Sequence, residues 1–236
     1  MLGRALLDLV LPADCAGCGM PGRTICVACA DVLAAPALPV MPDPRPVGFP
    51  PCWAVATYGG PARSALLAYK ERGRADLLPA LGAALAGAVL AGPVGTCRHP
   101  GPFVLVPVPS RTSAVRERGG DTTLELARSA AAVLRRAGVP ARARPGLLLA
   151  RATLDSAGLD AVSRAANLGG AMTGRERLLR TAGARRLVVV DDLVTTGATL
   201  TEAGRALAAA GHRPCAAAVI AATARRLRVG LGAAPD

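Results

Sequence analysis

The stretch from Val188 to Leu200 reads Val-Val-Val-Asp-Asp-Leu-Val-Thr-Thr-Gly-Ala-Thr-Leu and decides the fold class. It continues an apolar run, Leu187 to Val190, that is typical of a central strand in a parallel sheet. Two adjacent acids follow, and a loop rich in Thr then opens an amphipathic helix from Thr199 to Ala210. This order predicts an α/β fold with the loop at the carboxyl end of a strand, where such sheets bind ligands.

The residue types in this loop suit a ribose phosphate. Asp191 and Asp192 can accept hydrogen bonds from sugar hydroxyls or hold a water on a metal ion, whereas carboxylates are poor partners for phosphate. Backbone N–H groups at a helix start, together with hydroxyls and the helix dipole, favour the phosphate instead. The predicted phosphate loop comprises Leu193, Val194, Thr195, Thr196, Gly197, Ala198 and Thr199. The alternative is a plain strand–helix turn, while the absence of Gly-Lys-Ser/Thr excludes a Walker-type loop.

Composition leaves two explanations for the strong positive charge. The chain has 236 residues, 52% of them apolar, and a formal charge of +12. Such a charge suggests nucleic acid or an anionic substrate as a partner. The basic residues are almost all Arg, with Lys70 the only lysine, and this Arg- and Ala-rich composition is also typical of GC-rich coding sequences. Aromatic side chains on which bases could stack are few.

Two apolar stretches resemble targeting or membrane segments. Leu2 to Leu11 is interrupted by Asp8 and lacks a small-residue cleavage site before Cys15, which favours a short amphipathic helix over a signal peptide. The run from Leu77 to Ala91 contains Pro79 and is shorter than the roughly 20 residues of a transmembrane helix. We therefore expect a buried helix, no membrane span and a cytoplasmic location.

Four of the seven cysteines form two Cys-x-x-Cys pairs separated by seven residues: Cys15, Cys18, Cys26 and Cys29. Each pair can aim two thiolates at one ion, so the spacing predicts a tetrahedral zinc ribbon. Sulfur fills all four positions, so the zinc is expected to be structural. Disulfides and a redox Cys-x-x-Cys are the alternatives, but a reducing cytosol disfavours the first and the second needs only one pair.

The rest of the first half is read as a linker followed by short elements. Cys52, Cys97 and Cys215 are expected to be small buried side chains. Ala34 to Pro51 is Pro-rich and lacks periodicity, which predicts a linker. The further expected elements are a strand at Ala54–Gly59, a helix at Ala62–Arg72, a strand at Phe103–Pro109, a helix at Thr122–Ala137 and a strand at Leu147–Ala150.

Basic residues outside the phosphate loop supply further candidates. Arg63 and Lys70 lie seven residues apart on the predicted helix and either meet an anion or are solvated; spacing alone favours solvation. The loop from 110 to 121 follows a strand and can bind diphosphate through forked Arg donors, or it is simply a solvated basic loop. Its candidate ligands are Ser110, Arg111, Arg116 and Arg118.

A long polar stretch from Arg151 to Ala171 is a candidate lid, because long loops in compact domains often cover a site. Transfer at an anomeric carbon passes through an oxocarbenium-like state that water intercepts, so a cover has a physical use. Arg151, Arg164 and Asn167 would serve in such a lid. The alternative, a helix that packs on the sheet, stays open.

Together these pieces resemble the ComF family across nearly the whole chain. The motifs are the four-cysteine ribbon, Tyr58-Gly59-Gly60 with Arg63 and Lys70, Val106-Pro107-Val108-Pro109 with Arg116, Arg118 and Gly119, then Arg164 with Asn167, and the loop after Val190. The resemblance implies a type I phosphoribosyltransferase-like parallel sheet flanked by helices. It also implies that Asp191 and Asp192 hold the ribose hydroxyls of phosphoribosyl diphosphate (PRPP), that the loop binds its 5-phosphate, and that a hood between Trp53 and Arg74 reads the acceptor.

Three features depart from the pattern of many relatives. Arg118-Gly119-Gly120-Asp121-Thr122 stands where Arg-Gly-Phe-Asn-Gln is common, which removes an aromatic and an amide near the predicted diphosphate loop. Asp155-Ser156 stands where a glutamine is common. Cys52 alone cannot form the second ribbon that many relatives carry.

The expected organisation has four parts: a helix, zinc ribbon and linker in residues 1–52, a hood or connecting segment in 53–99, a phosphoribosyltransferase-like core in 100–224 and a basic tail in 225–236. The expected function is Mg²⁺-dependent transfer of phosphoribosyl from PRPP to an acceptor that the sequence does not identify. The alternative is a non-catalytic protein of DNA uptake that senses PRPP or binds single-stranded DNA and partner proteins, since some ComF members are linked to natural transformation.

Overall fold

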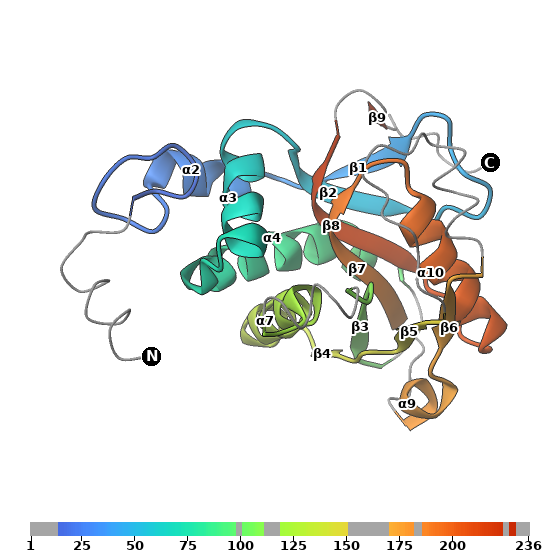
Figure 1. The fold of residues 1–236 in the computed structure, drawn as a ribbon. Helices are drawn as coiled ribbons and strands as arrows, with labels where there is room; N and C mark the ends of the chain where they lie inside the picture. The colour runs from blue at the N-terminus through green and yellow to red at the C-terminus, as the bar shows by residue number, and fades with distance from the viewer. Residues whose placement is uncertain are drawn as a thin grey trace.

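The computed structural model describes residues 14–97, 101–110, 119–150, 170–181, 186–223 and 227–229. Its centre is a seven-stranded sheet in the order β4-β3-β7-β8-β2-β1-β9 (Figure 1). The neighbouring pairs from β4 to β2 are all parallel, whereas β1 is antiparallel to both β2 and β9. The expected α/β class with a mostly parallel sheet is thus confirmed.

The strands are β1 Leu38–Pro42, β2 Cys52–Thr57, β3 Phe103–Pro107, β4 Ala141–Ala143, β5 Leu147–Leu149, β6 Met172–Gly174, β7 Arg186–Val194, β8 Ala216–Ala222 and β9 Leu227–Val229. The helices are α2 Val27–Leu33, α3 Gly60–Glu71, α4 Leu78–Ala91, α5 Pro93–Thr96, α7 Thr122–Arg136, α9 Glu176–Thr181 and α10 Ala198–Ala209, with a short 3-10 turn η1 at Ala75–Leu77.

Side chains on the central strands alternate between two apolar layers, because successive residues of a strand point to opposite faces. On β7, Val188 and Val190 pack into the layer formed with α3, α4 and α7. Leu187 and Val189 pack into the other layer, which contains residues of α10, β5 and β6. All four are at most 1% exposed. Burial on both faces explains why this strand reads as a continuous apolar run.

The expected buried helix is α4, which contacts α7 and strands β2 and β8. Leu81, Leu85 and Val89 on it are completely buried. The combined stretch Ala75–Thr96 is long and apolar enough to cross a membrane by length and composition, and 56% of its tested window is buried inside the fold. The core helix of a soluble protein passes the same test.

Part of the Pro-rich segment predicted as a linker, Leu38–Pro42, forms strand β1 of the sheet, so the prediction is wrong for these residues. Leu38–Val40 pair with residues 52–54 of β2 on one side. On the other side, Val40–Pro42 pair with β9. The prolines of this segment mask the apolar alternation of a strand, and prolines are tolerated toward the edge of a sheet. The segment predicted as a basic tail contains β9, whereas the predicted helix at 2–11 lies outside the described residues.

Two of the lone cysteines are joined. Cys97, directly after α5, and Cys215, directly before β8, form a disulfide with a Cα–Cα distance of 5.9 Å across 118 residues of sequence. The expectation of separate buried side chains is therefore wrong for this pair, because the two meet only through the tertiary fold. Cys52 is buried and free, as expected.

We predict that reduction of this disulfide lowers the melting temperature. Closing a long loop restricts the unfolded chain and typically stabilises a fold by about 2–4 kcal/mol, or about 4–16 °C for a chain of this size. Thermal melts with and without dithiothreitol measure the effect. The reductant imitates a reducing compartment, which would keep the pair as thiols. The Cys97→Ala/Cys215→Ala variant should melt identically in both buffers, and Cys52→Ala should keep the difference. Equal sensitivity of the double variant would contradict the prediction.

Candidate functional site

The predicted acidic pair lies inside β7, which runs on to Val194, so Leu193 and Val194 complete the strand before the loop begins. Asp192 is only 4% exposed. Its carboxylate Oδ1 lies 2.6 Å from the Nζ of Lys70 on α3. The prediction that Lys70 is solvated is therefore wrong. Spacing could not reveal its partner, because that partner lies on a strand distant in sequence. Arg63 on the same helix is exposed, as expected for a solvated side chain.

The two carboxylates of this pair influence each other. The backbone N–H of Asp192 donates to Asp191 Oδ1 at 2.9 Å. Burial, and next the neighbouring charge of Asp192, raise the pKa of Asp191 well above its ordinary value, and Lys70 opposes this increase. Ionised together, the two acids leave an excess of negative charge over the single lysine. Hydroxyl donors or a hydrated cation would relieve that excess, which makes the pair a candidate binding site.

The turn after β7 requires glycine at its last position. Gly197 caps α10 with a left-handed φ of +77°. A Cβ added there would lie 2.8 Å from the Phe49 ring and from Pro42 Cγ. Only glycine therefore satisfies both the conformation and the space. The helix that follows has 12 residues, and its first N–H groups have no partner within the helix, as an anion site needs.

Threonines supply the polar surface of this turn. Thr195 and Thr199 are partly exposed, whereas Thr196 is buried. The Thr196 hydroxyl accepts a hydrogen bond from the Ala198 N–H at 3.5 Å, a long contact. The structure therefore brings the predicted phosphate loop, Thr195 to Thr199, to the end of the strand that carries both acids.

Residues that sequence reasoning missed support the loop from outside. Phe49 and Pro42 come from the Pro-rich segment and pack against Gly197. Ala171, just before β6, packs with Ala198 at the start of α10. No spacing or residue type in the sequence indicated these contacts, since each depends on chain segments far from the loop.

The predicted diphosphate loop is anchored at both ends. The Ser110 hydroxyl donates to Asp121 Oδ1 at 2.9 Å. The same oxygen accepts from the Leu124 N–H at 3.2 Å, so Asp121 is the N-cap of α7. Ser110 is thus bonded within the protein. Arg111, Arg116 and Arg118 lie outside the described residues.

The candidate lid also has fixed ends, although Arg151, Arg164 and Asn167 lie outside the described residues. β5 and β6 form a separate antiparallel pair, and the Ala150 N–H donates to the Ala171 carbonyl at 2.7 Å. Buried Glu202 on α10 accepts from the Met172 N–H at 2.9 Å and pairs with Arg205, which also donates to the Met172 carbonyl. The described residues on either side of 151–169 are thus bonded to each other, and one of them, Ala171, packs with Ala198 at the phosphate loop.

A cavity of about 640 Å³ opens beside Lys70, the partner of Asp192. It lies between the end of α3, the turn into η1 and the start of α7, and Lys70 contributes to its wall while contacting Asp192. The lining residues are Tyr69, Lys70, Glu71, Arg72, Gly73, Ala75, Gly119, Gly120, Thr122 and Glu125.

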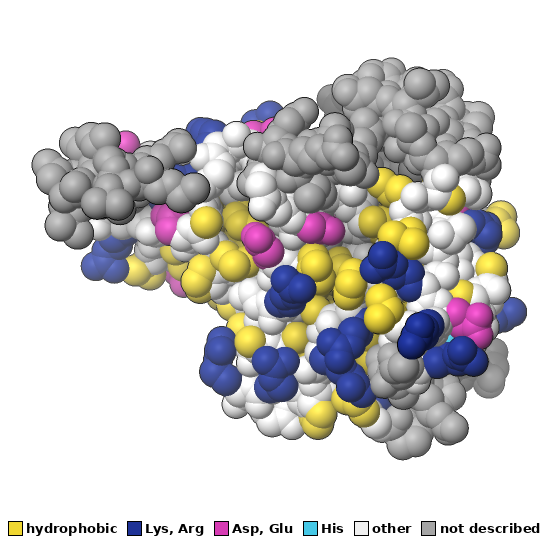
Figure 2. Space-filling model, turned by 60° about the horizontal axis from the view of Figure 1, so that its bottom comes forward, with side chains coloured by type: hydrophobic (Ala, Val, Ile, Leu, Met, Phe, Trp, Pro, Cys, Tyr) yellow, Lys and Arg dark blue, Asp and Glu magenta, His cyan; other side chains and the backbone are white. Residues whose placement is uncertain are grey.

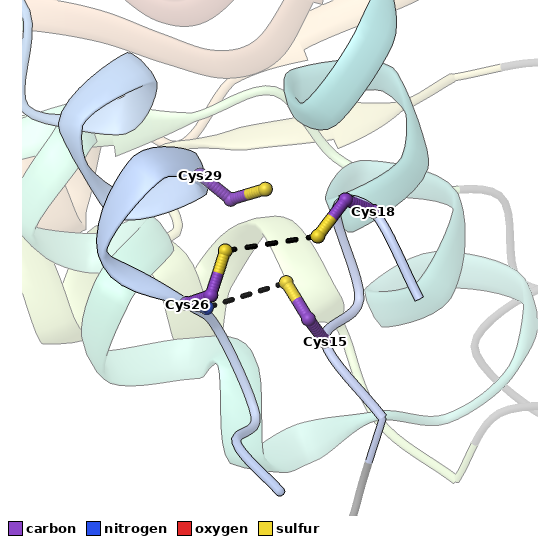
Figure 3. Close-up of side chains that lie close together, drawn as sticks. All are labelled: Cys15, Cys18, Cys26 and Cys29. Carbon is purple, nitrogen blue, oxygen red and sulfur yellow. Dashed lines mark hydrogen bonds between the residues drawn. The ribbon is translucent and has the colours of Figure 1, made fainter. Parts of the chain in front are cut away.

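The four predicted zinc ligands converge, as Figure 3 shows, with all four sulfur atoms within 4.8 Å of one another. The sulfurs of Cys18 and Cys26 are 3.7 Å apart. Tetrahedral zinc with four thiolates places its sulfurs about 3.8 Å apart, so the cluster fits a structural zinc ion.

The electrostatics of the cluster also favour a cation. Burial alone would raise the pKa of Cys15, but backbone N–H groups, chiefly that of Cys26, outweigh it and lower this pKa to about 6. The pKa of Cys29 is raised, first by burial and then by the neighbouring thiols. Four thiolates so close together repel one another and need a dication to compensate their charge. Metal binding is therefore coupled to deprotonation of the four thiols.

The cysteine cluster is docked against the helices that line the cavity. The Arg74 guanidinium donates to the Asp14 carbonyl at 3.1 Å and pairs with Asp76 on η1. A Cβ on Gly17 would lie 2.6 Å from the Cys29 sulfur and 3.2 Å from Pro61 Cβ on α3. The cluster is therefore packed on α3 rather than held on a free arm.

A comparison with models of known protein families found no match, and a search among curated proteins found none either. The fold and the site define the class: an α/β protein with a mostly parallel sheet, an acidic pair and a polar loop at the end of a central strand, and a four-cysteine metal-binding cluster near its N-terminus.

We predict one zinc ion per chain in protein purified without chelator, measured by elemental analysis. Cys18→Ser, at the exposed ligand, should lower the zinc content and the melting temperature, because the segment around the cluster has few buried side chains of its own. Cys52→Ala is the matched control and should retain one zinc. Absence of zinc from the native protein would refute the assignment.

Proposed function

We propose that the protein binds PRPP with Mg²⁺ at the carboxyl end of β7 and transfers its phosphoribosyl group to an acceptor. The observation that carries this proposal is the placement of Asp191 and Asp192 directly before a turn whose Gly197 opens α10. It agrees with the resemblance to the ComF family. A cytoplasmic location belongs to the same proposal.

In this proposal the acidic pair holds the ribose. Carboxylate oxygens accept hydrogen bonds from vicinal hydroxyls and also hold waters of a hydrated Mg²⁺. When bound, Mg²⁺ would neutralise charge on the diphosphate. Lys70 pairs with Asp192, and bound hydroxyls would share this carboxylate with it.

The turn after β7 receives the 5-phosphate. Thr195, Thr196 and Thr199 offer hydroxyls, and the first N–H groups of α10 offer donors aligned with the helix dipole. Gly197 lets the backbone approach the anion closely, and Phe49 fixes the turn from behind. A turn held in this way needs little rearrangement when it binds.

Leaving-group stabilisation and water exclusion are assigned to the two segments outside the described residues. The arginines of 111–118 would bind the departing diphosphate. The segment 151–169 would cover the oxocarbenium-like state, and the packing of the nearby residue Ala171 against Ala198 supports that role. Asp121 places a carboxylate at the start of α7, near the arginine loop, and this negative charge works against tight diphosphate binding.

We predict that PRPP with Mg²⁺ raises the melting temperature. A ligand at about 100 times its Kd stabilises by about 2.7 kcal/mol, which corresponds to about 5–10 °C. Asp192→Asn and Gly197→Ala should lose most of this shift, because the first weakens the ribose contacts and the second strains and crowds the turn. Asp31→Asn, at an exposed carboxylate on α2, is the matched control. No shift in the wild-type protein would refute the PRPP site. If the shift is found, diphosphate release separates an enzyme from a sensor.

A second function, binding of single-stranded nucleic acid, is favoured by one observation. Residues 126–149 contain five arginines and no acid: Arg128, Arg135, Arg136, Arg142 and Arg144. They belong to α7, β4 and the residues beside them, and Figure 2, which brings the bottom of Figure 1 forward, shows Lys and Arg side chains spread over its lower half. An Arg surface of this kind suits phosphates.

For this second function we predict that affinity for a single-stranded oligonucleotide falls steeply with salt, with a log–log slope of about −0.7 per phosphate contact. Combined Arg136→Ala and Arg144→Ala substitutions should reduce the magnitude of the slope by about 1 to 1.5. Arg213→Ala, at an exposed arginine after α10, should leave it unchanged. Binding that is insensitive to both salt and the double substitution would exclude this surface.

A further inference from the structure

A second cavity lies against α10 and shares no lining residue with the cavity beside Lys70. Its volume of about 520 Å³ is within the range of small-molecule sites. One wall is the Pro-rich segment after β1, and the other is α10 with the residues that follow this helix (Figure 1). We call this cavity the α10 groove.

The Pro-rich wall of the α10 groove is apolar and fixed in place. Val47 and Phe49 line it together with two prolines of the same segment. The Arg45 guanidinium donates to the Phe49 carbonyl at 3.1 Å, and the Phe49 N–H donates to the Pro46 carbonyl at 3.1 Å. A wall held in this way loses little freedom when a ligand binds. Val47 is 97% exposed, so an apolar ligand would cover surface that faces water.

The opposite wall contains a glycine that the helix does not require. Gly204 lies inside α10, where glycine destabilises a helix relative to alanine. Its φ is not left-handed. Among the described residues outside the helix, a Cβ on Gly204 would meet only Pro214 Cγ, at an ordinary contact distance of 3.9 Å. Neither conformation nor space therefore explains this glycine, but its missing side chain widens the groove that it lines.

The charged side chains of the groove leave one positive charge over. Two arginines and one carboxylate line it: Arg205, Arg213 and Glu202. Glu202 pairs with Arg205, whose Nε lies 2.7 Å from Oε2. Burial would raise the pKa of Glu202, but hydrogen bonds, chiefly from Arg205, lower it, so this carboxylate stays ionised. Arg213 is exposed and forms no salt bridge within the described part of the chain.

We propose that the α10 groove binds a small organic monoanion that has an apolar, aromatic body and a single carboxylate. The body would lie against Phe49 and the prolines, and the carboxylate would meet Arg213, whose forked donors match two carboxylate oxygens. One excess positive charge favours a monoanion over a phosphate ester, which carries nearly two negative charges at neutral pH.

This site is separate from the loop proposed to bind PRPP, and the inference does not depend on the proposed transfer. The two are neighbours through Phe49, which lines the α10 groove and also packs against Gly197. A ligand in the groove would therefore contact the side chain that supports the turn after β7.

The first test titrates the full chain with 2-naphthylacetate by isothermal titration calorimetry, with 2-naphthylacetamide as the uncharged analogue. The wild-type protein should bind the carboxylate about two- to fivefold more tightly than the amide, the effect of an exposed ion pair. Arg213→Gln should remove this preference and leave the affinity for the amide unchanged. Arg128→Gln, at an exposed arginine on α7, is the matched control and should keep the preference.

The second test fills the groove from the helix side. Gly204→Leu should lower the affinity for both naphthyl compounds more than tenfold, because its side chain occupies the space of the aromatic body. Gly204→Ala adds a single methyl group, so it should keep binding and raise the melting temperature by about 1–4 °C through the better helix former. Thermal melts check that both variants are folded.

Loss of binding in Gly204→Leu, together with the lost carboxylate preference in Arg213→Gln, supports the inference. It is overturned if the wild-type protein binds neither naphthyl compound at millimolar concentration, or binds the amide as tightly as the carboxylate. Wild-type affinity in a folded Gly204→Leu variant also overturns it. None of these measurements contains PRPP, so failure of the proposed function leaves this inference standing.

Discussion

The burial of Asp192 inside an otherwise apolar sheet is the constraint on which the site depends. A carboxylate that is 4% exposed must be compensated, and Lys70 supplies the opposite charge at 2.6 Å. Because that lysine is carried by α3, the ion pair links the helix layer above the sheet to the end of β7. The cavity, the cysteine cluster and the acidic pair all meet around α3.

Two parts of the chain that look peripheral in the sequence support the site directly. The Pro-rich segment forms β1 and places Phe49 against Gly197, so it fixes the turn that is proposed to bind phosphate. The cysteine cluster packs on α3 through Gly17 and Pro61 and on η1 through Arg74. A structural zinc would thus stabilise the same helices that line the cavity.

Prediction from sequence succeeded where a local pattern carries the information. The apolar run before Asp191 predicted β7, and the amphipathic stretch after it predicted α10. The paired cysteines predicted a cluster, and the sulfur positions confirm that the four thiols converge. It failed at β1, where prolines hid the strand, and at Lys70, where spacing favoured solvation over an ion pair. The disulfide between Cys97 and Cys215 was also missed, because no local sequence pattern around either cysteine indicates that the two lie together in the fold.

The sequence by itself determined the α/β class, the loop after β7 and the four-cysteine cluster, because strand and helix periodicity and the Cys-x-x-Cys spacing act over short distances. Tertiary structure alone decided that Lys70 pairs with Asp192, that Phe49 closes behind Gly197, and that the Pro-rich segment and α10 enclose a groove. Each of these arrangements joins residues more than 50 positions apart. They form only when the layers pack together, and no local preference of the chain encodes them.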